Sequence, residues 1–229
     1  MHTTLPYEQL NVAGHDGFLM VSPIRTPHWL IYAPTLTGLL PSVEEKWLFE
    51  KCLDAGISIA GVDVGESYGN LNGQAIYTEL YQFMVNKGFS SKVILYGRSR
   101  GGLMTLAWAV NHAECVAGIA GLYPVYNLVS YPGLYSVAST YNMTPQALQD
   151  KLAEYNPVDR VDILHGIPFF SVCGDIDNVV PYEMNTGRIK AKIHVECVMM
   201  KNQGHSMWPG YFTCQELVDF IIAIKVKNT

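Results

Sequence analysis

Short apolar runs alternate with longer segments of helical period along most of the chain. The apolar runs are four to seven residues long and predict strands at 30–33, 57–62, 93–97, 116–121, 169–173 and 194–200. Between them, apolar side chains recur every three or four residues and predict helices at 42–55, 72–87, 101–112, 183–190 and 214–224. This alternation predicts right-handed βαβ units and an α/β fold, a three-layer α/β/α sandwich around a mostly parallel, doubly wound sheet. In such sheets, ligands bind beyond the carboxyl ends of the strands.

One stretch, residues 123–159, does not follow this alternation of strands and helices. It lies between two predicted strands and is rich in Tyr, Pro, Ser and Asn, with Thr144-Pro145 as an expected helix start. It is too short for a separate domain. We therefore expect a small cap insertion over the sheet edge.

Composition and charge restrict the class of protein further. With 229 residues, 49% of them apolar and 15% charged, the chain is expected to form a single domain, 1–229, with a full hydrophobic core. The net charge is −5 and no basic block occurs, so we expect no nucleic acid partner. Since no apolar stretch approaches the roughly 18 residues that span a membrane, we expect no membrane partner either.

The N-terminal residues lack a basic segment followed by an apolar run, so they do not predict a signal peptide. A cytoplasmic location is favoured, and a secreted or periplasmic one stays open in case a signal peptide has been removed. The five cysteines form no C-x-x-C pair, and the histidines and cysteines show no paired spacing typical of zinc ligands. We expect reduced thiols, no metal and no cofactor, and we make no prediction of the oligomeric state.

A candidate nucleophile lies where a predicted strand meets a predicted helix. The segment Gly97-Arg98-Ser99-Arg100-Gly101 has the form G-x-S-x-G, with an apolar strand before it and an apolar helix after it. Glycine allows a tight turn that lifts the serine hydroxyl above the sheet edge. The N-terminal amides of the following helix then point to the place where negative charge develops.

A serine hydroxyl needs a base, and the base needs an acid that orients it. Of the seven histidines, His205 lies in a polar loop between the last strand and the last helix, where it can face Ser99. The acid is expected in the loop after the strand at 169–173. Asp177 is favoured there and Asp175 is the alternative.

These segments resemble the α/β-hydrolase family, and more narrowly its prolyl-oligopeptidase-like and dienelactone-hydrolase-like branch. The resemblance is carried by residues 97–101, 174–181 and 204–205 and extends from about Trp29 to the C-terminus. It implies an α/β-hydrolase fold with a Ser-His-Asp triad, and its G-x-x-D-x-x-V-P form places the acid at Asp177.

The resemblance also implies two backbone donors for an oxyanion. One is the amide of Arg100, directly after the nucleophile. The family takes the other from the loop after an earlier strand, which usually begins His-Gly. That pair is absent here, so by position the donor is Thr35 or Leu36.

The two arginines beside Ser99 have two interpretations. Arg98 and Arg100 either point away and pair with surface acids, or one of them reaches the pocket, where it would bind a carboxylate or stabilise the tetrahedral intermediate. An arginine after the serine resembles the G-C-S-R of glucuronoyl esterases, although the surrounding sequence does not.

Further candidates for substrate contact lie in loops that should reach the same edge of the sheet. They are Glu66, Tyr68, Tyr123, Tyr126 and Trp208. Aromatic faces with a few polar groups suit sugars or aryl esters, and each aromatic could equally be a packing residue.

We therefore predict a serine hydrolase that cleaves an ester, an esterase or deacylase acting through an acyl-enzyme on a small-molecule or glycan ester. A carbohydrate carrying an acyl or methyl ester is the expected substrate. The alternatives are a prolyl-oligopeptidase-like peptidase and a hydrolase-fold protein that binds a ligand without turnover. We rank the peptidase second because the peptidases of that branch carry a large propeller domain, for which a chain of this length has no room.

Overall fold

The computed structural model describes residues 5–34, 41 and 43–224. In this part of the chain, eight strands form one sheet in the order β1-β2-β4-β3-β5-β6-β7-β8. The strands are β1 (Glu8–Val12), β2 (His15–Met20), β3 (Trp29–Ala33), β4 (Ser58–Val62), β5 (Val93–Arg98), β6 (Val116–Leu122), β7 (Phe169–Gly174) and β8 (Glu196–Met200). β1 and β2 form an antiparallel hairpin, β2 pairs with β4 antiparallel, and β3 to β8 are parallel. The predicted mostly parallel α/β sheet is confirmed.

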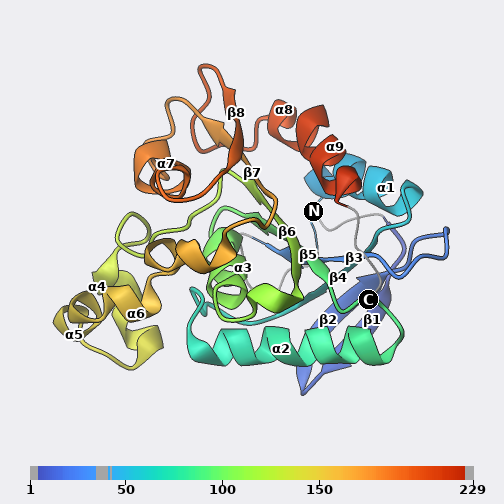
Figure 1. The fold of residues 1–229 in the computed structure, drawn as a ribbon, viewed down its shortest axis with the longest axis horizontal. Coiled ribbons are helices and arrows are strands. Elements are labelled where there is room, and N and C mark those ends of the chain that lie inside the picture. Colours follow the sequence, from blue (N-terminus) through green and yellow to red (C-terminus); the bar gives the residue numbers. More distant parts are fainter. Residues whose placement is uncertain (1–4, 35–40, 42, 225–229) are drawn as a thin grey trace.

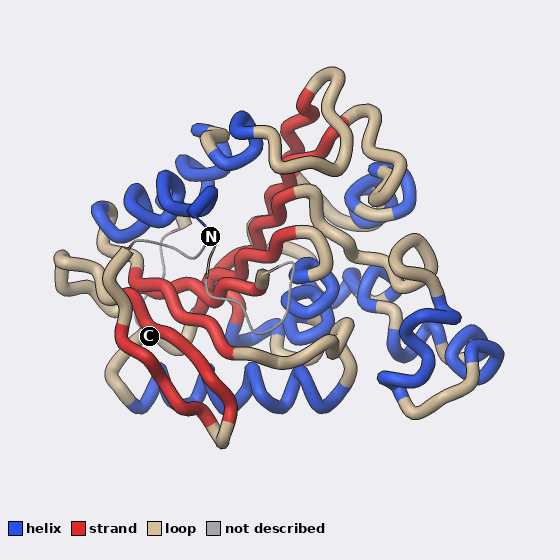
Figure 2. The backbone as a smooth tube through the Cα atoms, turned by 180° about the vertical axis from the view of Figure 1, so that it is seen from behind, coloured by secondary structure: helices blue, strands red, loops and turns tan. Residues whose placement is uncertain are grey.

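Helices cover both faces of this sheet (Figures 1 and 2). α2 (Leu71–Asn86) and α3 (Gly101–Ala109) pack on one face, while α1 (Lys46–Asp54) and α9 (Gln215–Ala223) pack on the other. Each face of the sheet has its own hydrophobic core, and alternate residues of β3 belong to one core or the other. Trp29, Ile31 and Ala33 face α2 and α3, and Leu30 and Tyr32 face α1 and α9. A strand buried on both faces reads as a continuous apolar run, which is why β3, β4 and β5 were predictable.

Several shorter helical segments lie outside the insertion between β6 and β7. They are α7 (Thr186–Lys190), α8 (Pro209–Phe212) and the 3₁₀ turns Val43–Glu45, Ala113–Cys115 and Tyr182–Met184. α3 is buried along its whole length, as its all-round apolar sequence predicted. No helix in the described ranges is both long and apolar enough to span a bilayer.

The segment between β6 and β7 forms a helical insertion at one end of the molecule (Figure 1). Its elements are α4 (Leu134–Val137), α5 (Pro145–Asp150), α6 (Leu152–Tyr155) and the 3₁₀ turns Ala138–Tyr141, Pro157–Asp159 and Val161–Leu164. The expected helix start is present, since Thr144 Oγ1 accepts the Ala147 amide at 3.2 Å and caps α5. A small core that includes Val125 and Leu148 packs the insertion against Leu103 of α3. The insertion therefore lies beside the start of the helix that follows Ser99.

Candidate active site

Ser99 lies on a strained turn between β5 and α3. Its φ is +50°, a region that non-glycine residues rarely adopt. The turn is tight, because a Cβ at Gly97 would lie 2.8 Å from the backbone of Gly101, and a Cβ at Gly101 would collide with the carbonyl oxygen of Ala33. The Ser99 amide donates to Leu122 O at 3.0 Å and its carbonyl accepts from Val125 N at 2.8 Å. Neighbouring elements thus hold the serine in its unfavourable conformation.

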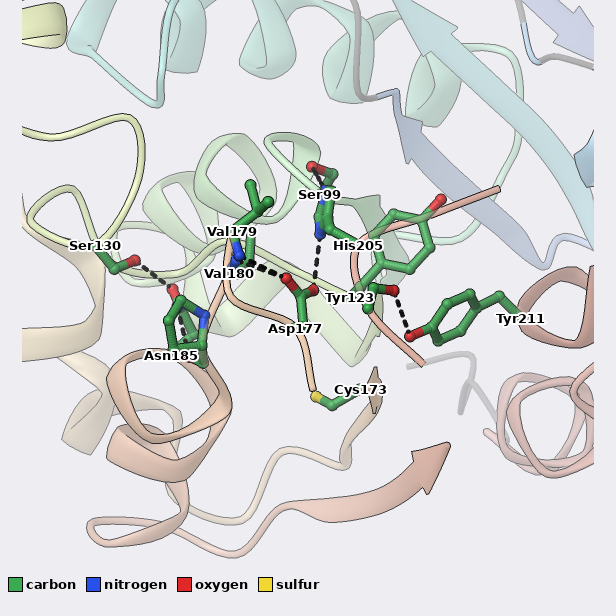
Figure 3. Close-up of polar contacts among 12 residues, drawn as sticks. Ser99, Tyr123, Ser130, Cys173, Asp177, Val179, Val180, Asn185, His205 and Tyr211 are labelled. Carbon is green, nitrogen blue, oxygen red and sulfur yellow. Dashed lines mark hydrogen bonds and ion pairs between the residues drawn. The ribbon is translucent and has the colours of Figure 1, made fainter. Parts of the chain in front are cut away.

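His205 faces this hydroxyl from the loop after β8. Its Nε2 lies 2.9 Å from Ser99 Oγ (Figure 3). Two contacts fix the loop: Tyr211 Oη donates to Gly204 O at 3.0 Å, and the Gln203 amide donates to Asp175 Oδ1 at 3.3 Å. The imidazole is partly exposed, so water and substrate can reach it.

Asp177 completes the chain of contacts from the loop after β7. Its Oδ2 lies 2.8 Å from His205 Nδ1, and its Oδ1 accepts the amides of Val179 and Val180 at 3.0 and 2.8 Å. The carboxylate is buried, and these donors stabilise its charge. An ionised carboxylate only accepts, so Nδ1 carries the proton and Nε2 is left to accept from Ser99. Asp175, the alternative acid, is exposed and contacts the backbone of the histidine loop instead.

Arg100 follows the serine directly and forms the N-cap of α3 with φ −55°. Its backbone amide therefore lies at the positive end of the helix dipole. Thr35 and Leu36, the expected sources of a second oxyanion donor, lie outside the described residues. The strand that leads to them ends beside the turn, since Ala33 pairs with Gly97.

The side chains of Arg100, Glu66 and Tyr68, three of the residues considered for substrate contact, lie together. Arg100 Nη1 lies 2.6 Å from Glu66 Oε2 and 3.4 Å from Tyr68 Oη, and the guanidinium carbon lies 5.9 Å from the Tyr68 ring centroid. Arg100 is 12% exposed at its side chain and Glu66 is 43% exposed. Burial and the neighbouring Glu66 raise the pKa of Tyr68 above its ordinary value. The three side chains form a polar group beside Ser99.

The side chain of Arg98 does not reach the site, so the substrate contact expected of it is wrong. Its Nη1 lies 2.6 Å from Glu45 Oε1, both side chains are buried, and Tyr32 Oη donates to the same carboxylate oxygen at 2.9 Å. The guanidinium also lies 5.5 Å from the ring centroid of Phe212. Arg98 therefore pairs with an acid in the core, whereas Arg100 pairs with the exposed Glu66, as the interpretation of surface pairing expected.

Besides Tyr68, three candidate aromatic residues remain, of which two lie near His205 and one does not. Tyr123 packs against His205, with ring centroids 4.7 Å apart at 66°. Trp208 is 39% exposed and packs on Tyr211. Tyr126 was wrongly expected to contact substrate: it is fully buried, its ring packs edge-on against Phe169, and its hydroxyl lies 3.5 Å from Ser171 Oγ.

Sequence reasoning missed a buried asparagine that holds the acid loop. Asn185 Oδ1 accepts from the amides of Tyr126 and Asn127 and from Ser130 Oγ, while its Nδ2 donates to Pro181 O. It therefore ties the helical insertion to the loop that carries Asp177 (Figure 3). Nothing in the local sequence marks this residue, since its partners come from distant segments. Tyr211, which donates to Gly204 O and packs against Tyr123, was also missed.

Fold and site together define the class of protein: a serine hydrolase with the α/β-hydrolase fold. Within that class the chain belongs to the prolyl oligopeptidase family, whose profile matches residues 66–219 of the 229. Among curated proteins, none matches this sequence.

Several solved structures share the fold at low sequence identity. A puromycin-hydrolyzing peptidase from Mycobacterium tuberculosis has a TM-score of 0.74 and 14% identity, over 96% of this chain and 40% of that chain. Dipeptidyl peptidase 4 from Porphyromonas gingivalis has a TM-score of 0.75 and 15% identity, over 98% and 36%. Est1E from Butyrivibrio proteoclasticus has a TM-score of 0.71 and 15% identity, over 93% and 95%. The chain therefore spans less than half of the two peptidases and nearly the whole of Est1E.

Proposed function

We propose that this chain hydrolyses a carboxylic ester through an acyl-enzyme, with Ser99 as nucleophile, His205 as general base and Asp177 as the acid that orients it. The observation that carries the proposal is the continuous contact from Ser99 Oγ to His205 Nε2 at 2.9 Å and from His205 Nδ1 to Asp177 Oδ2 at 2.8 Å. Because the Asp177 carboxylate fixes the proton on Nδ1, Nε2 is free to take the serine proton.

The reaction follows from these positions. Ser99 Oγ bonds to the ester carbonyl carbon while its proton moves to His205 Nε2. The Arg100 amide and the positive end of α3 stabilise the resulting oxyanion. The intermediate then collapses, the C–O bond to the alcohol breaks, and the leaving oxygen takes the proton from Nε2. Water releases the acyl group by the same steps, with His205 taking the water's proton.

The side chains around the triad support a modest ester of a sugar or an aryl alcohol. Tyr123 and Trp208 offer aromatic surface beside the base, and the Arg100–Glu66 pair with Tyr68 offers polar groups beside the nucleophile. Rings of sugars and aryl groups bind to such surfaces by stacking combined with a few directed hydrogen bonds. We propose an acylated or methyl-esterified carbohydrate as the natural substrate, and the helical insertion as a wall beside it.

Peptide hydrolysis is the second candidate, and family membership favours it. The prolyl oligopeptidase family match covers the segment with all three catalytic candidates, and two of the similar structures are described as peptidases. The same triad can attack an amide, although the amine of an amide is a poorer leaving group than the alcohol of an ester.

A direct comparison of substrates tests the proposal. The purified chain is given p-nitrophenyl acetate and butyrate, peptide p-nitroanilides, and acetylated or methyl-esterified oligosaccharides. Ester turnover that Ser99→Ala abolishes and Ser206→Ala retains is the expected result, because Ser206 is an exposed serine next to the base. Faster cleavage of the anilides would favour the peptidase, and no turnover of any substrate would favour a binding protein.

A further inference from the structure

Two large apolar side chains are exposed immediately after the base. Met207 and Trp208 follow His205 by two and three positions and are 50% and 39% exposed. Scattered apolar residues on a surface need no explanation, but adjacent ones beside a catalytic group indicate a contact surface. We refer to these two residues as the apolar rim.

Trp208 is held in place by the backbone beneath it. Its ring packs edge-to-face on Tyr211, with centroids 5.6 Å apart at 83°. A Cβ at Gly210 would collide with the six-membered ring of the indole, so glycine is required there for the indole to lie over the backbone. Pro209, at the start of α8, fixes the chain between them. The indole is therefore oriented before any ligand binds.

Met207 is connected to the base through one side chain. Tyr123 Oη donates to Met207 Sδ at 3.8 Å, and the ring of Tyr123 packs on His205 at 4.7 Å. Tyr123 also packs against Tyr211, with centroids 4.9 Å apart. The same two tyrosines thus support the imidazole and both residues of the apolar rim. Figure 3 shows His205 with Tyr123 and Tyr211 beside it.

The chemistry of the histidine decides which part of a substrate lies over the rim. Nε2 takes the serine proton and must return it to the leaving atom, so that atom lies within hydrogen-bond reach of Nε2. The rest of the leaving group then extends over the residues next to the imidazole. The acyl part lies on the other side, where the Arg100 amide receives the oxyanion.

We propose that Met207 and Trp208 form the leaving-group subsite and that it takes an aromatic ring. This inference rests on the proposed acyl transfer by Ser99. An aromatic ring fits because the exposed indole offers a fixed π-face and the thioether sulfur packs favourably against ring edges. The rim selects the alcohol or amine that departs and has no contact with the acyl group.

A pair of acetate esters isolates this effect. Phenyl acetate and hexafluoroisopropyl acetate release alcohols of similar acidity and form the same acetyl-enzyme, so their kcat/KM values differ through the leaving-group subsite. We expect Trp208→Ala to lower the ratio of phenyl to hexafluoroisopropyl kcat/KM about five- to tenfold, the size of one lost aromatic contact. Trp208→Phe should keep most of the preference, because it retains an aromatic ring. Ile222→Ala, which removes an apolar side chain of similar exposure on α9, is the matched control.

Each other outcome is decisive. Hydrolysis with the same ratio in Trp208→Ala and Met207→Ala as in the wild type would overturn the subsite and leave the proposed function standing. Failure of the wild type to hydrolyse either ester would contradict the proposed function and the subsite with it. An unchanged ratio together with a changed sedimentation mass would assign the rim to contact with a second copy. Should Trp208→Ala not fold, Met207→Ala tests the same subsite by lowering the same ratio.

Discussion

The guanidinium of Arg98, the residue before Ser99, lies 2.6 Å from the carboxylate of Glu45, and both side chains are buried. The pair joins the end of β5, the strand before Ser99, to the turn that precedes α1. A buried ion pair is held by mutual attraction and by hydrogen bonds that offset lost hydration. Tyr32 supplies one such bond to Glu45.

Removing one partner of this pair should destabilise the fold strongly. Arg98→Met leaves a buried, uncompensated carboxylate, and we expect the free energy of unfolding to fall by about 3 kcal/mol or more. The double variant Arg98→Met/Glu45→Leu should recover most of that loss, since neither charge remains. Urea denaturation of the wild type, Arg98→Met, Glu45→Leu and the double variant measures the four free energies of unfolding. Additive losses in the double variant would show that the two residues do not act as a pair.

The two aspartates of the acid loop should differ sharply in their effect on rate. Asp177→Asn replaces the acceptor of the Nδ1 proton with an amide, which permits the wrong tautomer, and we expect kcat to fall about 10⁴-fold. Asp175→Asn, two positions away, retains an oxygen for the Gln203 amide and should stay within a few-fold of the wild type. Steady-state kinetics with a p-nitrophenyl ester measure kcat for both variants. A similar loss of kcat in the two would contradict the assignment of Asp177 as the acid that orients His205.

Gly101 should not tolerate a side chain, whereas Gly204 should. A Cβ at Gly101 would collide with the Ala33 carbonyl, and relieving that contact requires the strand or the turn to move. We expect Gly101→Ala to lower stability by about 3 kcal/mol and to abolish activity. A Cβ at Gly204 meets only Ile176 O at 3.6 Å, so Gly204→Ala should leave the melting temperature nearly unchanged. Equal thermal shifts for the two variants would contradict the tight-turn geometry.

The cysteines should react in a definite order. Cys197 is partly exposed, and its hydrogen bond with Cys173 lowers its pKa, so more of its thiolate is present at pH 8. Burial raises the pKa of Cys52 to about 12 and that of Cys214 to about 11. Limiting iodoacetamide at pH 8, read by peptide mass spectrometry, should modify Cys197 well before Cys52 or Cys214. Preferential modification of Cys52 would contradict the described packing.

Much of the fold was predictable because its central strands are buried on both faces. The hairpin of β1 and β2 was not, since these strands mix exposed and buried positions and lie at the edge of the sheet. The place of Arg98 could have been found from alternation: Ile94, Tyr96 and Arg98 share one face of β5, the face that α1 and α9 cover.

Site residues that directly follow a strand could be predicted from the sequence. Residues whose side-chain direction depends on tertiary packing could not. Ser99, Asp177 and His205 come after β5, β7 and β8, whose carboxyl ends lie at the same edge of the sheet. Their place in the alternation of strands and helices therefore predicted that they meet. Tyr123 and Tyr126 were indistinguishable in sequence. The chain turns at Tyr123, whose φ is +35°, and this sends one ring to the histidine and the other into the core.

The most direct measurement is the rate at which a fluorophosphonate modifies the chain, with the adduct located by mass spectrometry. We expect one adduct, on Ser99, and a loss of at least about 10³-fold in rate for His205→Gln, because the serine then lacks its base. His165→Gln, which changes a histidine outside the site, should react like the wild type. An adduct on another residue, or an undiminished rate in His205→Gln, would contradict the assignment of Ser99 and His205 as nucleophile and base.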